Sequence, residues 1–166
     1  MYTKTILDPM NKNEYINSKS VLRSIRVIYF ALILGLLSFL SVTFLISQDF
    51  RFAFDKNDPV LFANLILFIS AIPLGYLVPQ SIWKRIEKGL PLQDKLLKYQ
   101  TGFLIRLATC EGVGLFSIVG FLISNNLFYL VLTGIILLII FYYFPSLGKL
   151  ELQLDLSYTE LDELKK

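Results

Sequence analysis

Histidine is absent from this chain of 166 residues, and cysteine occurs only once, as Cys110. A single cysteine excludes a disulfide framework within the chain, and without histidine there is no zinc site of mixed Cys and His ligands. The base of a Ser-His-Asp or Cys-His catalytic set is missing as well. A serine–lysine pair stays open as a catalytic pair, but no lysine lies in a hydrophobic stretch. We therefore expect a protein that is not an enzyme and that has no metal or other cofactor.

Charged residues are scarce too. They make up 17% of the chain, whereas 55% of the residues are hydrophobic, and the mean hydropathy is +0.61. A soluble domain carries about 25% charged residues, which form much of the polar surface around its apolar core. This chain has too few charges for such a surface. Its composition therefore predicts an integral membrane protein.

Four hydrophobic stretches account for this composition, at residues 27–47, 60–83, 102–124 and 127–144. A helix of about 21 residues rises roughly 30 Å, which matches the hydrocarbon core of a bilayer. The first stretch ends without the small-residue cleavage site of a signal peptide, so we interpret it as a retained helix. The predicted fold is all-α: a polytopic, four-helix transmembrane bundle that forms one domain over residues 1–146.

Proline and acidic residues indicate where two of these helices begin. Asp58-Pro59 is typical of a helix start, so the second helix is predicted to begin there. Pro73 in its interior frees the carbonyl of Ile69, which kinks the helix or offers an acceptor to a neighbour. The third helix is expected to begin before the bilayer, near Leu92, after a loop that contains glycine and proline.

Residues 147–166 are predicted to form a short, amphipathic cytoplasmic tail. The first part of the tail alternates like a strand, but Ser157 and Glu160 have the spacing of a capping box, which favours helix. We therefore expect a helical tail whose acidic side chains, Glu160 among them, face solvent.

The basic residues are distributed unevenly along the chain. Five lie in residues 1–26, five in residues 84–98 and three in residues 147–166, whereas the loop 48–59 has two. Lysine and arginine favour the cytoplasmic side of a membrane. We therefore expect a multi-pass protein of the bacterial inner membrane whose N and C termini, with the polar leader of 26 residues, are cytoplasmic.

Glu111 lies in the middle of the third stretch, where an ionisable side chain costs roughly 2.5–3.5 kcal/mol on insertion scales. Counting about 1.5 Å per residue from the edge of each span puts Ser38, Ser70 and Thr133 at the same depth. Two interpretations are open. In one, this intramembrane polar cluster is a proton or ion site. In the other, a protonated glutamate holds the helices together through hydrogen bonds, at roughly 0.6 kcal/mol each.

Arg106 precedes Glu111 by five residues, which is about 140° around a helix and roughly 7.5 Å along it. The two side chains therefore point to different faces and do not pair within the helix. We expect Arg106 to extend to the lipid headgroups, or to contact a partner such as Tyr29 or a lipid phosphate. Asn64, near the outer end of the second helix, is expected to form an interhelical hydrogen bond or to contact lipid or a partner.

Small residues form two surfaces that allow helices to approach closely. Ala31 and Gly35 are four residues apart on the first helix, and Ala108, Gly112 and Gly114 lie on the third. We expect these five residues to mediate helix packing.

Four short motifs follow one another between residues 94 and 145. They are Lys98-Tyr99-Gln100-Thr101 at the start of the third helix, the acid–glycine pair Glu111-Gly112, the turn Asn125-Asn126, and Pro145-Ser146 before an acidic tail. With these motifs the segment resembles a family of small four-helix bacterial membrane proteins for which no activity is established. Val113 departs from that family, which often has proline after the acid–glycine pair. The resemblance implies a four-helix fold and a membrane location, and it implies no function.

These observations favour a non-enzymatic accessory or assembly subunit of a larger membrane complex. The loops are short, no catalytic set is recognisable, and two helices carry small-residue faces. The alternative is a small oligomeric transporter or channel that uses Glu111 as its proton or ion site. The expected partners are the lipid bilayer and either other membrane protein subunits or further copies of the chain, and not nucleic acid.

Overall fold

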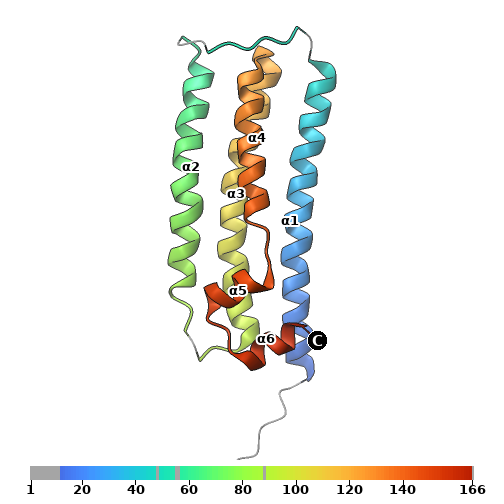
Figure 1. The fold of residues 1–166 in the computed structure, drawn as a ribbon, viewed down its shortest axis with the longest axis vertical. Coiled ribbons are helices and arrows are strands. Elements are labelled where there is room, and N and C mark those ends of the chain that lie inside the picture. Colours follow the sequence, from blue (N-terminus) through green and yellow to red (C-terminus); the bar gives the residue numbers. More distant parts are fainter. Residues whose placement is uncertain (1–11, 48, 55–56, 88, 166) are drawn as a thin grey trace, which may run out of the picture.

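The computed structural model describes residues 12–47, 49–54, 57–87 and 89–165, so the first eleven residues of the predicted polar leader lie outside the described residues. Within the described residues the chain forms six helices. They are α1 (Lys12–Ile46), α2 (Pro59–Trp83), α3 (Leu92–Ser124), α4 (Leu127–Tyr142), α5 (Leu147–Leu154) and α6 (Tyr158–Lys165). In Figure 1, α1 to α4 run along the long axis of the molecule, while α5 and α6 lie across one end. That end also holds the start of α1 and the α2–α3 loop, and we call it the basic end. We call the opposite end the loop end.

Three of these helices are long and apolar enough to cross a membrane: α1 from residue 18 onward, α2 and α3. A fourth span is reached only if α4 and α5 are counted together across the bend of 74° between them. Alone, α4 has 16 residues and rises about 24 Å, which is short of the roughly 30 Å hydrocarbon core. The all-α fold and the membrane-spanning helices therefore agree with the sequence, whereas the bundle of four spans stays a prediction.

The helix α4 ends at Tyr142, before the predicted end at residue 144. Pro145 accounts for the break, because a proline has no N–H to donate and disfavours helical geometry at the residue before it. Ser146 then caps α5, since its Oγ accepts from the backbone N–H of Lys149 at 3.4 Å. The chain therefore turns sharply between α4 and α5.

The helix α2 begins where the sequence predicts. Asp58 Oδ1 accepts from the backbone N–H groups of Val60 and Leu61, at 2.9 and 3.2 Å, and Pro59 occupies the first turn. The second carboxylate oxygen of Asp58 accepts from the Tyr129 hydroxyl at 2.9 Å. The residue that caps α2 is thus also bound to α4.

The helix α3, which starts at Leu92 as predicted, lies at the centre of the fold. It packs against α1, α2 and α4, whereas these three have few contacts with one another in the described chain. Its buried apolar residues recur every three or four positions along almost its whole length. They are Leu92, Leu96, Tyr99, Phe103, Leu107, Cys110, Val113, Ile118 and Phe121. A matching stripe on α1 consists of Ile25, Tyr29, Ile33 and Leu36.

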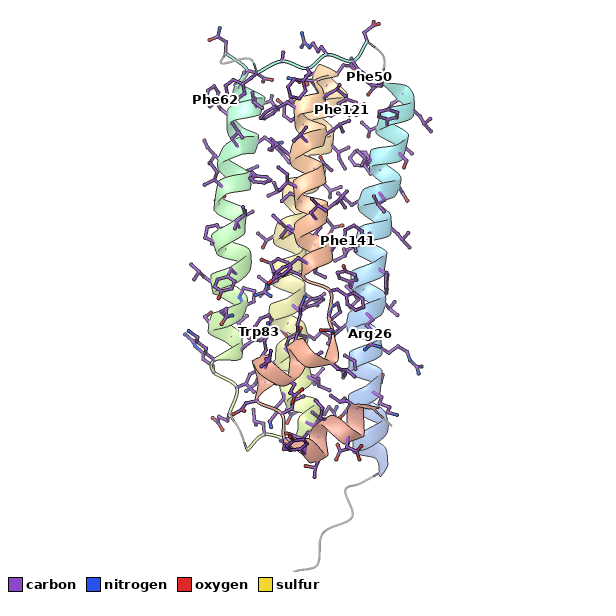
Figure 2. All side chains as sticks on the ribbon, in the orientation of Figure 1. Arg26, Phe50, Phe62, Trp83, Phe121 and Phe141 are labelled. Atoms are coloured by element: carbon purple, nitrogen blue, oxygen red, sulfur yellow. The ribbon has the colours of Figure 1, made fainter. Side chains whose placement is uncertain are left out.

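The loop end is closed by the loop between α1 and α2, which passes over the α3–α4 turn (Figure 1). The backbone N–H of Arg51 donates to the carbonyl of Asn125 at 3.1 Å, and the carbonyl of Arg51 accepts from the N–H of Leu127 at 2.8 Å. Phe50 stacks on Phe121, with 5.9 Å between the ring centroids, and Figure 2 shows both residues at this end. Residues 49–54 of this loop are therefore held against the α3–α4 turn.

The tail folds onto the basic end of the bundle. Both tail helices bury leucines, namely Leu150, Leu154, Leu161 and Leu164. Glu160 Oε1 accepts from Lys95 Nζ of α3 at 2.7 Å, and the Lys95 side chain is only 4% exposed. Glu160 Oε2 also accepts from the backbone N–H of Ser157 at 2.8 Å, and the N–H of Glu160 donates to Ser157 Oγ at 3.4 Å, so the capping box is present. The expectation that Glu160 faces solvent is wrong, because this carboxylate neutralises a buried lysine.

Candidate functional site: Glu111 and Arg106 on helix α3

Two ionisable residues lie in the apolar part of α3, and they occupy different faces of the helix, as their spacing predicts. Arg106 is buried, with 5% of its surface exposed, whereas Glu111 is half-buried. The two residues therefore belong to two separate candidate sites.

Glu111 belongs to a face of α3 that the other helices leave partly open. The half-buried or exposed residues of this face follow one another at helical spacing: Leu104, Ala108, Glu111, Gly112, Leu115, Val119 and Leu122. Within the described part of the chain, the Glu111 carboxyl makes no hydrogen bond and no ion pair. An unpaired carboxyl in hydrocarbon costs several kcal/mol, so a hydrogen-bond donor from outside the chain would be stabilising here.

The three hydroxyl groups expected at the depth of Glu111 do not bond to it or to one another in the described chain. Ser70 Oγ donates to the carbonyl three residues back in α2, and Thr133 Oγ1 donates to the carbonyl four residues back in α4, both at 3.0 Å. Ser38 is exposed on α1. Hydroxyl groups in helices commonly bond to their own backbone in this way. The structure therefore forms no hydrogen-bonded cluster from these residues, and a shared role as an ion site stays a prediction.

A groove of about 290 Å³ lies between α2 and α3. It is lined by Ser70 of α2, by Ala108 and Gly112 of α3, and by apolar side chains. A Cβ atom added to Gly112 would meet no atom within 4 Å. Gly112 therefore borders open space beside the face that carries Glu111.

One of the five small residues expected to pack helices does so within the chain. A Cβ atom at Gly114 would lie 3.2 Å from Leu36 of α1 and 3.4 Å from Ile136 of α4, so this glycine allows three helices to approach closely. The other four residues are exposed: Ala31, Gly35, Ala108 and Gly112. Their role in packing can then concern only another chain, and it stays a prediction.

Asn64 is fully buried and connects α2 to α3. Its Oδ1 accepts from Ser117 Oγ at 3.0 Å, and its Nδ2 has no partner in the described chain. An interhelical hydrogen bond is one of the roles that the sequence suggests for Asn64. Because the residue is buried, it does not reach lipid.

Arg106 is enclosed within the bundle, and its expected contact with lipid headgroups stays a prediction. Its guanidinium lies between two aromatic rings, 4.6 Å from the centroid of Trp83 and 4.5 Å from that of Tyr143. Arg106 Nε donates to the carbonyl of Gly75 at 2.9 Å. Tyr29, considered above as its partner, donates to a carbonyl of α4 instead, at 3.2 Å. The arginine is therefore held by α2 and by the end of α4.

The acceptor for Arg106 exists because of a proline in α2. Pro79 has no N–H, so the carbonyl of Gly75, four residues back, receives no such bond from its own helix. Arg106 Nε supplies a donor from α3. The same rule predicts a free carbonyl at Ile69, four residues before Pro73. Applied to Pro79 as well, it would have identified Gly75 as an acceptor.

An aromatic column beside Arg106 holds the basic ends of α2 and α3 together. The Trp83 ring stacks on Tyr99, with 5.0 Å between centroids and 17° between planes, and Trp83 Nε1 donates to the carbonyl of Tyr99 at 3.2 Å. Figure 2 shows Trp83 at this end of α2. A Cβ atom at Gly102 would lie 2.5 Å from Trp83 Nε1, so only glycine leaves room for the ring. This contact could not be predicted from the sequence around Gly102, because the large partner comes from another helix.

Arg106 also lines a cavity of about 220 Å³ toward the basic end, with Tyr76, Gln80, Tyr99, Tyr142, Tyr143, Lys149 and Gln153. Two buried polar atoms of these residues have no partner in the described chain, Arg106 Nη2 and Gln153 Oε1. Lys149 Nζ donates to the carbonyl of Tyr142 and lies 4.9 Å from the centroid of its ring. The cavity therefore offers a cationic donor and a neutral acceptor to a group that enters it.

No protein-family model, no curated protein and no solved structure matches the chain. The resemblance of residues 94–145 to a family of small membrane proteins therefore assigns no family, and the geometry of the two sites on α3 is the basis for any function.

Proposed function

We propose that this protein is a non-enzymatic accessory subunit of a membrane complex, which binds its partner through the open face of α3. One observation carries the proposal. Glu111 lies in the apolar part of a helix able to cross a membrane, half-buried and without a hydrogen-bond partner in the described chain. A donor from a second polypeptide would remove much of the cost of that carboxyl.

The surroundings of Glu111 suit a helix rather than a large irregular segment. Ala108 and Gly112 lie beside it on the same open face, and small residues let helix backbones approach closely in membranes. Lipid chains would fill the same space but offer no hydrogen-bond donor. The partner that fits is therefore a transmembrane helix of another membrane protein with a polar donor near the middle of the bilayer.

The charge distribution supports a location and an orientation for this subunit. Lysine and arginine are concentrated in the leader, the α2–α3 loop and the tail, whereas the α1–α2 loop has two. By the positive-inside rule we place the basic end in the cytoplasm of a bacterial inner membrane, with α1 to α4 as four spans and both termini cytoplasmic.

A substitution at Gly112 tests the docking face. Because a Cβ atom at this position meets no atom within 4 Å and the residue borders an open groove, Gly112→Leu should leave the thermal stability of the isolated protein unchanged or slightly raised. It should obstruct a partner helix, so that gentle affinity purification with mass spectrometry loses a stoichiometric partner that the wild type retains. Gly134→Leu is the matched control, because a Cβ atom at Gly134 of α4 likewise meets no atom within 4 Å and this glycine does not belong to the open face of α3. A wild-type protein that purifies alone, or equal retention by both variants, would contradict the proposal.

The unpaired carboxyl also supports a second candidate, a small oligomeric transporter or channel that uses Glu111. Glu111→Gln separates the two functions, because the amide forms hydrogen bonds but does not ionise. An accessory subunit should keep its partner with Glu111→Gln and lose it with Glu111→Leu. A transporter should lose ion or proton flux in proteoliposomes with Glu111→Gln, and unchanged flux would eliminate that candidate.

A further inference from the structure

The cavity at Arg106 contains a positive charge that the described chain does not balance. Arg106 is 5% exposed, and its hydrogen bond goes to the neutral carbonyl of Gly75. Within the described residues it makes no ion pair, and Nη2 has no partner at all. The two aromatic rings beside the guanidinium attract a cation but do not neutralise it. A buried cation without a counterion is strongly disfavoured, so an anion bound beside Arg106 would stabilise the protein.

A second unsatisfied atom in the same cavity comes from an independent part of the chain. Gln153 lies in α5, and its Oε1 is buried without a donor. Buried polar atoms are rarely left unpaired in folded proteins. Two residues that line the cavity thus each have one buried polar atom without a partner in the described chain, a donor of Arg106 and an acceptor of Gln153.

The remaining lining residues favour a negatively charged ligand at the membrane surface. Lys149 adds a second cation, and among the residues that the structure describes neither aspartate nor glutamate lines the cavity. Tyr76 and Tyr142 line it and are also exposed on the outside of the bundle, and apolar side chains of the same two helices, such as Leu77 and Phe141, are exposed as well. Tyrosine is enriched where a membrane protein meets the headgroups. A ligand in this cavity can thus have a polar group inside and an apolar part along the bundle.

We propose that this cavity binds a phosphate ester that carries a hydroxyl group, supplied by the headgroup of an anionic phospholipid. The free Nη groups of Arg106 and the ammonium of Lys149 hold the phosphate oxygens, an arrangement that suits the planar guanidinium. The Gln153 Oε1 accepts from the hydroxyl of the headgroup. Phosphatidylglycerol, a phosphodiester, has this chemistry, and glycerol 3-phosphate, a soluble phosphomonoester, also carries a phosphate and hydroxyl groups but has no acyl chains.

The test measures the thermal unfolding of the detergent-purified protein with added ligands. Phosphatidylglycerol is expected to raise the Tm, and phosphatidylcholine, which has a phosphate but neither net charge nor hydroxyl, is expected to leave it unchanged. Lys149→Gln should weaken the apparent affinity for phosphatidylglycerol about tenfold, since hydrogen bonds to charged groups are worth that much. Lys84→Gln is the matched control, because it removes the same charge from an exposed site at the basic end that does not line the cavity.

Two further arms identify the source of the phosphate and the role of the hydroxyl. Stabilisation by glycerol 3-phosphate equal to that by phosphatidylglycerol would assign the site to a soluble phosphate ester, and weaker stabilisation assigns it to the lipid. Gln153→Leu should abolish a preference for phosphatidylglycerol over phosphatidic acid, whose headgroup has no glycerol. No Tm shift with any of the phosphate ligands, or equal affinity losses in Lys149→Gln and Lys84→Gln, would overturn the proposal.

Discussion

Arg106 Nε lies 2.9 Å from the carbonyl oxygen of Gly75, and this hydrogen bond joins α3 to α2 inside the apolar part of the bundle. The carbonyl is available because Pro79, four residues further along α2, has no N–H to donate. The proline thus leaves one carbonyl of α2 without its helical donor, and the arginine of α3 supplies a donor in its place. In hydrocarbon, where water cannot serve as the partner, such compensation is required.

The first prediction is that Arg106 and Pro79 are energetically coupled. In Pro79→Ala the new backbone N–H provides a helical partner for the Gly75 carbonyl, so Arg106→Gln should destabilise this variant less than the wild type. A coupling free energy of about 0.5–3 kcal/mol is expected for such a pair, measured by unfolding in mixed detergent micelles. Pro73→Ala is the control, because it changes a different carbonyl of the same helix. Additive effects in both cycles would show that the proline is irrelevant to the arginine.

The second prediction uses the single tryptophan of the chain as a reporter. Gly102→Ala places a Cβ atom 2.5 Å from Trp83 Nε1, so the ring must leave its position on Tyr99. We expect a loss of about 1–3 kcal/mol of unfolding free energy, as for other overpacked sites, together with a shift in tryptophan emission. Gly112→Ala should leave the emission unchanged and gain about 0.5–1 kcal/mol, because a helical glycine in open space is replaced by a better helix former. Identical spectra for the two variants would contradict the observed packing of Trp83.

The third prediction concerns the pH dependence of tail docking. Burial alone raises the pKa of Glu160, but the hydrogen bonds from Lys95 and Ser157 outweigh it, so the pKa lies below its ordinary value of 4.5. A carboxyl with a lowered folded-state pKa contributes stability that is complete above the unfolded value and is lost as the pH falls through the folded value. The tail should therefore stay docked at neutral pH and loosen below about pH 4. A spin label on a cysteine at the exposed position of Tyr158 should report this as increased mobility.

Two variants decide whether the Lys95–Glu160 pair is the cause of that loosening. Glu160→Gln should make the label mobile at every pH, because the buried lysine loses its counterion. The double variant Lys95→Met with Glu160→Leu removes both charges and should dock without pH dependence. A tail that loosens at the same pH in the double variant and in the wild type would exclude the pair.

The fourth prediction is the orientation in the membrane. Single cysteines at Asn57 and Glu87, both at exposed positions at opposite ends of the bundle, should react differently with an impermeant thiol reagent added to intact cells. Asn57→Cys should be labelled and Glu87→Cys should not. The native Cys110 is buried and should give little background. The reverse labelling would mean that the basic end is outside and that the lysine and arginine count misleads.

The parts of the fold that local signals determine could be predicted from the sequence. The cap at Asp58, the start of α3 near Leu92 and the capping box of Ser157 and Glu160 each depend on residues a few positions apart. The early end of α4 at Tyr142 and the sharp turn after it were harder to predict from the sequence. This bend brings Lys149, which follows α4 in the chain, back toward α3. This turn of the chain encloses Arg106. Counting residues along α3 predicts the depth of Arg106 but not its contacts with the tail.

The rotation of each helix about its own axis could not be predicted from the sequence. This rotation determines which side chains meet at the candidate sites. Counting residues gives the depth of Ser70 and Thr133, but not whether their hydroxyl groups turn toward Glu111 or toward their own backbone. The glycines of α3 also show that a residue's position along a helix does not predict which side chains it contacts. Gly102 and Gly112 lie on one helix, yet only Gly102 contacts a large ring, because Trp83 is supplied by a different segment.

The central position of α3 has a consequence for the order of events during biosynthesis. The helices α1 and α2 leave the ribosome before α3 exists, and they have few contacts with each other in the described chain. Each can rest in the bilayer alone, since a helix satisfies its own backbone hydrogen bonds, but neither meets its buried neighbours until Ser124 has been synthesised. Lys95 then stays without its counterion until the ribosome has passed Glu160. A nascent chain that stalls inside α3 would therefore leave two independent helices in the membrane, exposed to whatever degrades or binds unassembled segments.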